Sequence, residues 1–148
     1  MRLLIQRASR ASVTVDGRVV SSIGLGYVIL VGVGEGDGPE QVGPLADKVA
    51  GLRIFRDADG KTNLAIGDVG GDALVVSQFT LYADASKGRR PSFIRAAEPS
   101  AAEELVEAFA RALEEREIRV GRGVFGAEME VELVNDGPFT MWLEAEAG

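Results

Sequence analysis

Two short segments carry the residues whose types and spacing could do chemistry. Ser77-Gln78-Phe79-Thr80 places hydroxyl and amide groups in a run that is otherwise apolar. Asn135-Asp136-Gly137-Pro138-Phe139-Thr140 places a Gly-Pro pair between two runs of alternating apolar residues. Glycine adopts backbone angles closed to other residues, and the bond before proline is the one peptide bond that is cis at appreciable frequency. Such a segment can therefore point two successive carbonyl oxygens the same way and press backbone against a ligand.

Both segments also have an ordinary structural interpretation. Asn, Asp, Gly and Pro are the commonest turn formers, so residues 135–138 could simply join the two strands of a hairpin. Hydroxyl groups on a strand, such as those of Ser77 and Thr80, are commonly satisfied by neighbouring backbone. If residues 77–80 are functional, we expect them to supply hydrogen-bond donors to an oxyanion, from backbone N–H groups and a hydroxyl.

The residues that are absent narrow the chemistry further. The 148 residues include no Cys and no His. This excludes disulfides, thiol nucleophiles, Cys/His zinc sites and every triad that uses imidazole. A hydroxyl nucleophile would need Lys48, Lys61 or Lys87 beside it, and the sequence gives no indication of that. Hydrolysis would have to use a carboxylate, a hydroxyl, the backbone or the substrate itself, and we expect no metal and no cofactor.

The charge of the chain is negative overall but unevenly distributed. A net charge of -7 argues against a polyanionic partner. Basic residues nevertheless gather in two places, namely Lys87, Arg89, Arg90 and Arg95 in one, and Arg2, Arg7 and Arg10 in the other. A local phosphate-binding patch and a solvated basic loop are both compatible with this pattern.

Hydrophobic periodicity and turn residues predict the elements that position these segments. The predicted strands are residues 3–15, 18–23, 27–33, 53–55, 73–83, 128–133 and 141–144. The predicted helices are residues 39–52, starting or kinked at Pro44, with Asp37 as a helix cap, and residues 99–117. This order predicts a single α/β domain over residues 1–148, with mixed or antiparallel sheets forming a barrel-like core and two main helices packed outside.

No segment of the sequence indicates a membrane or an export signal. The longest apolar run, residues 27–31, is far too short to cross a bilayer. The first seven residues lack the long apolar stretch and small-residue cleavage site of a signal peptide. We therefore expect a cytoplasmic protein with no membrane partner.

Taken together, the motifs resemble those of the D-aminoacyl-tRNA deacylases. They are Ser77-Gln78-Phe79-Thr80-Leu81, Arg90-Pro91-Ser92-Phe93, Phe125-Gly126-Ala127, the Gly-Pro segment, and the opening Ile5-Gln6-Arg7 with Ala11-Ser12-Val13. The likeness covers essentially the whole chain in order. It implies an enzyme that hydrolyses the ester between a D-amino acid and the 3′ end of tRNA, a chiral proofreading step in translation. It also implies mischarged glycyl-tRNA as a second substrate and no DNA partner.

The resemblance assigns roles to particular residues. It implies a homodimer in which Gly137 and Pro138, joined by a cis bond, reach into the partner's pocket and exclude L side chains, with Arg7 orienting them. The backbone N–H of Phe79 would bind the oxyanion with help from Thr80, while Ser77 and Gln78 line the same catalytic site. The 2′-hydroxyl of the terminal ribose would position the water, so that no protein base is needed.

Two departures from the family pattern and two competing functions remain open. Phe139 stands where a smaller aliphatic residue is common, and Gly121-Arg122-Gly123 replaces a more usual hydroxyl-bearing stretch. One alternative function is an esterase with Ser77 or Thr80 as covalent nucleophile. The other is a non-catalytic tRNA-binding module that uses the basic residues 87–95.

Overall fold

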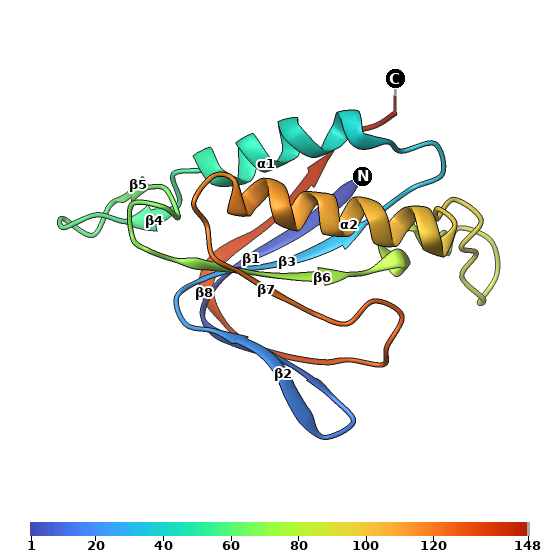
Figure 1. The fold of residues 1–148 in the computed structure, drawn as a ribbon, viewed down its shortest axis with the longest axis horizontal. Helices are drawn as coiled ribbons and strands as arrows, with labels where there is room; N and C mark the ends of the chain where they lie inside the picture. Colours follow the sequence, from blue (N-terminus) through green and yellow to red (C-terminus); the bar gives the residue numbers. More distant parts are fainter. Residues whose placement is uncertain (148) are drawn as a thin grey trace.

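The computed structural model describes residues 1–147 and consists of a curved sheet covered by helices (Figure 1). The large sheet contains β1 (Arg2–Val15), β2 (Arg18–Ile23), β3 (Gly26–Gly32), β6 (Asp72–Ser77), β7 (Val120–Arg122) and β8 (Glu130–Glu144). A separate hairpin contains β4 (Phe55–Arg56) and β5 (Thr62–Leu64). The helices are α1 (Val42–Gly51) and α2 (Pro99–Glu114), with two 3-10 turns, η1 (Pro39–Gln41) and η2 (Phe79–Tyr82).

The long strand β1 organises the sheet. Its first half pairs with β3 and its second half with β2, while β8 runs antiparallel to it on the other side. The pairs β3–β6 and β6–β7 are parallel. The sheet curls until β2 contacts β7, where a Cβ at Gly121 would collide with the Ser21 hydroxyl. The mixed sheet is thus nearly a closed barrel, and the predicted fold class is confirmed.

Both helices lie side by side on one face of the sheet (Figure 1). Their apolar residues, among them Leu45 and Val49 of α1 and Phe109 and Leu113 of α2, pack in the main core. Strand β3 is buried on both faces, as its continuous apolar run predicts. Helix α1 begins two residues before Pro44, so Pro44 lies in the first turn of the helix. Backbone N–H groups in the first turn have no intrahelical partner, so the missing N–H of proline costs no hydrogen bond there. Within the described chain, none of the helices is both long and apolar enough to cross a bilayer.

The prediction of one strand over residues 73–83 is wrong at its second half. Strand β6 ends at Ser77, and the Gln78 N–H still donates to the Val31 carbonyl at 2.8 Å. The chain then turns into η2, which lies across the end of β3. The polar residues that interrupt the apolar run therefore mark the end of a strand and the start of a turn.

The Gly-Pro segment does not connect two strands of a hairpin. Asn135 pairs with Ala8 and Thr140 pairs with Gln6, so both halves of β8 pair with the same strand, β1. Residues 136–139 stand opposite Arg7 alone and form a bulge in a continuous strand. The peptide bond between Gly137 and Pro138 is cis.

Candidate active site

A cavity of about 450 Å³ lies where β3 and β6 end, against η2 and the start of α2. Ser77 and Gln78 contribute its polar lining. Its other lining residues are apolar, and they include Val31, Val33, Phe79, Phe93, Phe125 and Met129. The rings of Phe79 and Phe93 meet edge to face with their centres 5.1 Å apart. We call this space the main cavity.

The turn at residues 77–80 leaves hydrogen-bond donors free beside the main cavity. The side-chain amide of Gln78 donates to the Thr80 hydroxyl. Within residues 1–147, neither Phe79 nor Thr80 donates its backbone N–H to another group. Both residues are exposed. They open a 3-10 turn, and the first N–H groups of such a turn have no partner within it. Two adjacent donors are therefore available to an incoming oxygen atom.

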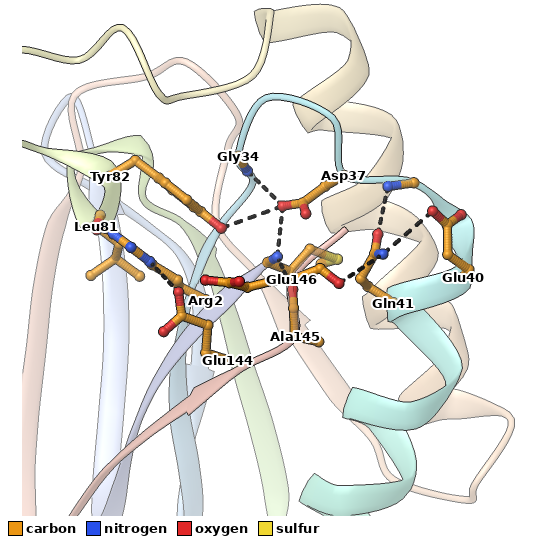
Figure 2. Close-up of polar contacts among 12 residues, drawn as sticks. Arg2, Gly34, Asp37, Glu40, Gln41, Leu81, Tyr82, Glu144, Ala145 and Glu146 are labelled. Carbon is orange, nitrogen blue, oxygen red and sulfur yellow. Dashed lines mark hydrogen bonds and ion pairs between the residues drawn. The ribbon is translucent and has the colours of Figure 1, made fainter. Parts of the chain in front are cut away.

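Contacts from β1 and β8 hold η2 in place (Figure 2). Arg2 of β1 donates to the Leu81 carbonyl at 2.8 Å and to the Glu144 carboxylate at 2.9 Å. Its guanidinium also lies 4.3 Å from the centre of the Tyr82 ring. The hydrogen bond from Arg2 lowers the pKa of the Glu144 carboxyl below its ordinary value.

A buried carboxylate fixes the other end of η2 (Figure 2). Asp37 Oδ2 accepts hydrogen bonds from the Gly34 N–H at 2.7 Å and from the Tyr82 hydroxyl at 3.4 Å, and it lies 2.6 Å from the Met1 amino group. Burial, and then the charge of Asp37, raise the pKa of Tyr82 to about 12. The predicted role of Asp37 as a helix cap is wrong, because Gly38 precedes η1 and Asp37 instead ties the loop to η2.

Two glycines allow η2 to lie against β3. A Cβ on Gly32 would stand 2.9 Å from the Leu81 Cβ and 3.2 Å from the Gln78 carbonyl oxygen. A Cβ on Gly34 would stand 2.6 Å from the Tyr82 ring. Because real Cβ atoms do not approach other atoms this closely, both positions require glycine for the observed packing.

Arg7 holds the Gly-Pro segment through hydrogen bonds to its backbone. Its side chain is 1% exposed, and its guanidinium donates to the carbonyl oxygens of Asp136 at 3.1 Å, Gly137 at 3.3 Å and Ile54 at 2.5 Å. The Phe139 ring covers the guanidinium with its centre 4.6 Å away. The unusual aromatic residue at position 139 therefore packs on Arg7 by a cation–π contact.

The side chains of Asp136 and Asn135 also hold the Gly-Pro segment in place. The Asp136 carboxylate accepts two hydrogen bonds from Arg56, at 2.9 and 3.0 Å, and lies 3.2 Å from Arg7 Nε. The Arg56 hydrogen bonds, followed by the charge of Arg7, lower the pKa of Asp136. Asn135 Nδ2 donates to the Arg7 carbonyl at 2.9 Å. Gly137 and Pro138 remain exposed at the crest of the bulge.

The two predicted groups of site residues do not meet within one chain. Arg7 is in register with Tyr27, Tyr27 is in register with Ala73, and Ser77 lies four residues further along β6. At ordinary strand spacings, the Gly-Pro bulge and Ser77 are roughly 20 Å apart along the sheet. The main cavity accordingly has no lining residue from positions 135–140.

Residues 121–123, the second segment that departs from the family pattern, connect β7 to α2 through Arg122. Arg122 donates to both Glu107 carboxylate oxygens, at 2.9 and 3.0 Å, and to both Glu114 carboxylate oxygens, at 2.6 and 3.4 Å. These hydrogen bonds raise the pKa of Arg122 and lower that of Glu114. Arg122 thereby joins β7 to α2 beside a second cavity of about 470 Å³, which shares Ser77 with the main cavity.

Sequence reasoning missed Gly32, Gly34, Arg56 and Glu107, and it named Arg2 and Asn135 without the contacts by which they build the site. All of them act through contacts between segments that are distant in the chain. The spacing of Gly32 and Gly34 at the end of a buried strand is the one local signal that indicates a close approach of other backbone.

Comparison with known proteins defines the class. A family model described as D-Tyr-tRNA(Tyr) deacylase matches residues 4–144. The D-aminoacyl-tRNA deacylases of Thermomicrobium roseum and Roseiflexus castenholzii are 61% and 59% identical to the chain. Each alignment covers 98% of this chain, and 94% and 92% of the two relatives, respectively.

Two solved structures share the fold of this chain. The structure named c-Myc DNA Unwinding Element Binding Protein superposes with a TM-score of 0.92 and 37% identity, covering 99% of this chain and all of its own. A probable eukaryotic D-amino acid tRNA deacylase has the same fold, with a TM-score of 0.81 at 17% identity, over 96% of this chain and 97% of its own. The chain belongs to the D-Tyr-tRNA(Tyr) deacylase family. The predicted family is thus confirmed, and so is the predicted class of enzyme, an ester hydrolase.

Proposed function

We propose that this chain hydrolyses the ester that links a D-amino acid to the 3′-terminal ribose of tRNA. The observation that carries the proposal is the pair of free backbone N–H groups at Phe79 and Thr80 beside the main cavity. Preorganised donors at the position of a developing oxyanion are often the largest single contribution to acyl-transfer catalysis. The aromatic side chains of Phe79 and Phe93 in the cavity wall would suit the terminal base, because bases stack on aromatic rings.

The reaction uses the substrate's own hydroxyl in place of a protein base. None of the described residues that line the main cavity is a carboxylate, a lysine or an arginine. We infer that the ribose 2′-hydroxyl orients a water molecule, which adds to the ester carbonyl. The resulting oxyanion accepts hydrogen bonds from Phe79 and Thr80, and its collapse expels the ribose 3′-oxygen, which takes up the proton that the attacking water releases through the 2′-hydroxyl. Gln78 assists by holding the Thr80 hydroxyl in place.

The lining of the main cavity argues against the alternative in which Ser77 or Thr80 acts as a covalent nucleophile. Ser77 or Thr80 would need a neighbouring base, and the closest polar partner of Thr80 is the Gln78 amide, which donates a hydrogen bond and cannot accept a proton. A chemical role for Ser77 is accordingly limited to lining the site and binding the substrate.

Stereochemical selection falls to the Gly-Pro bulge of a second subunit. Because Gly137 and Pro138 are exposed and roughly 20 Å from Ser77 of their own chain, they can complete only the site of a partner copy. In a homodimer, their backbone would occupy the space that an L side chain needs, and Arg7 holds that backbone in orientation. Glycine has no side chain to exclude, so mischarged glycyl-tRNA is also a substrate.

The proposed setting is proofreading of translation in the cytoplasm. The substrate is a freely diffusing aminoacylated tRNA, so the function involves neither a membrane nor DNA. The name of one solved relative refers to DNA, and that reference applies to that protein alone.

The test compares the two stereoisomers of one substrate. The purified protein should clear D-tyrosyl-tRNA and leave L-tyrosyl-tRNA at its uncatalysed rate of hydrolysis, with no acyl adduct on the protein by mass spectrometry. An intact D-ester would overturn the proposed activity. Equal cleavage of both esters would overturn the selector, and an adduct on Ser77 or Thr80 would replace the water mechanism with a covalent one.

A further inference from the structure

A closed basic loop projects beside the mouth of the main cavity. Asp84 and Ser92 form two backbone hydrogen bonds with each other, each 2.8 Å long, and these bonds close residues 85–91 into a loop. The Asp84 carboxylate also accepts the Ser86 N–H at 2.9 Å, and hydrogen bonding to the Ser86 side chain, followed by that to its N–H, lowers the pKa of Asp84. We call residues 84–92 the basic loop. These contacts close the base of the loop.

The cations of the basic loop have no charged partner among the residues that the structure describes. Lys87, Arg89 and Arg90 are exposed, and within residues 1–147 none of them forms an ion pair or a side-chain hydrogen bond. Several other arginines are neutralised, as Arg56 is by Asp136 and Arg122 by Glu107 and Glu114. Asp84 is the one acidic residue among residues 84–92.

The same segment forms part of the cavity wall. Phe93, which follows the basic loop directly, packs on Phe79 and lines the main cavity together with Ala96 and Ala97. Arg90 is three residues from Phe93, so its Cα lies within about 10 Å of the wall. The loop lies at the end of the sheet where α2 begins, and the β4–β5 hairpin lies at the opposite end (Figure 1).

We propose that Lys87, Arg89 and Arg90 bind the backbone phosphates of the single-stranded 3′ end of the tRNA. The inference rests on the proposed function, because the terminal ribose must sit in the main cavity for the preceding phosphates to reach the loop. A chain of net charge -7 repels a polyanion at long range, so it needs a local cationic surface to admit one. Lysine and arginine contacts to phosphates bind without reading sequence, which suits an enzyme that accepts many tRNAs.

The experiment compares a full substrate with a minimal one. Wild type, Lys87→Gln/Arg89→Gln/Arg90→Gln and the milder Lys87→Gln/Arg89→Gln are assayed on D-tyrosyl-tRNA and on D-tyrosyl-adenosine, which lacks the preceding phosphates. The control is Arg18→Gln/Lys48→Gln/Lys61→Gln, which removes the same charge from exposed positions outside the basic loop. Thermal unfolding confirms that each variant is folded.

The ratio of kcat/KM for the two substrates should fall about tenfold in the triple loop variant at low salt and stay near the wild-type value in the control. The slope of log kcat/KM on tRNA against log salt should become shallower by about 2, since each lost contact to single-stranded phosphate removes about 0.7. An unchanged ratio and slope would overturn the inference. A loss of equal size on both substrates would also overturn it, because the loop would then support the wall of the main cavity and would not bind phosphates.

Binding of uncharged tRNA separates this inference from the proposed activity. The triple loop variant should bind uncharged tRNA more weakly than wild type and the control, whether or not any ester is cleaved. Equal affinities would refute the phosphate contacts. A wild-type protein that binds tRNA through the loop but leaves D-tyrosyl-tRNA intact would refute the proposed activity alone.

Discussion

At the scale of single residues, Arg7 is the group on which the Gly-Pro bulge depends. It is buried, it donates to the carbonyl groups of Asp136, Gly137 and Ile54, and the Phe139 ring covers it. A lysine could not replace this planar set of donors, because an ammonium group lacks the fixed fork of a guanidinium. The bulge is therefore held by backbone-directed contacts, and the residues at its crest are free to face a ligand.

Gly137→Ala separates the selector role from stability. An added Cβ meets only Asn135 Oδ1, at an ordinary 3.8 Å, so the free energy of unfolding should change by less than about 0.5 kcal/mol. If Gly137 faces the substrate of a partner subunit, kcat/KM on D-tyrosyl-tRNA should fall about tenfold, because small displacements of a positioned substrate are costly. The matched control, Gly43→Ala in α1, also has open space and should leave the kinetics unchanged. Wild-type kinetics for Gly137→Ala would remove the selector role.

Asp136→Asn tests the charge that supports the bulge. The folded-state pKa of Asp136 is lowered, mainly by Arg56, so ionised Asp136 stabilises the fold above its ordinary pKa of about 4, and this stability disappears as the pH falls through the lower folded-state pKa. Near pH 7 the variant should lose about 2 kcal/mol of unfolding free energy. Urea unfolding should show the two proteins converging below about pH 4. A difference that is constant with pH would mean that the Asp136 charge is not involved.

At the scale of elements, the decisive contact is that of η2 with the end of β3. Gly32 and Gly34 leave room for Leu81 and Tyr82, and Arg2 and Asp37 bind η2 from the two sides (Figure 2). This contact fixes the direction of the Phe79 and Thr80 N–H groups, although none of the four supporting residues lines the main cavity.

Gly32→Ala should displace this turn. The new Cβ would stand 2.9 Å from the Leu81 Cβ, so we expect a loss of about 1–3 kcal/mol in unfolding free energy from overpacking. The value of kcat should fall more than KM rises, because donors to the oxyanion act mainly in the transition state. Gly24→Ala, where a Cβ meets nothing within 4 Å, is the control. A Gly32→Ala enzyme with normal kcat would show that the position of η2 does not govern catalysis.

Much of this architecture could be predicted from the sequence, and the exceptions share a cause. Periodicity identified β3 and both helices, because their burial pattern is local. It wrongly extended β6 through Ala83, because apolar residues that pack on glycines in another strand look locally like strand residues. The pairing of both halves of β8 with β1, and the contacts of Arg2 and Asp37, depend on partners far along the chain.

At the scale of the whole molecule, the two candidate groups of residues lie in different parts of one sheet. The free N–H groups belong to η2, which follows the end of β6, and the Gly-Pro bulge belongs to the middle of β8, where it stands opposite Arg7. In a single copy the main cavity and the Gly-Pro bulge, the proposed selector, are therefore separate. Joining two copies is the simplest arrangement that completes both sites, and the basic loop would then guide the tRNA to each mouth.

The most direct measurement is a crystal structure with a non-hydrolysable 3′-(D-tyrosylamino)-adenosine analogue. The account predicts the analogue in the main cavity, its carbonyl oxygen within hydrogen-bond distance of the Phe79 or Thr80 N–H, and Pro138 of the partner subunit in contact with the aminoacyl group. An analogue bound elsewhere, or a cavity closed with Pro138 facing solvent, would contradict it.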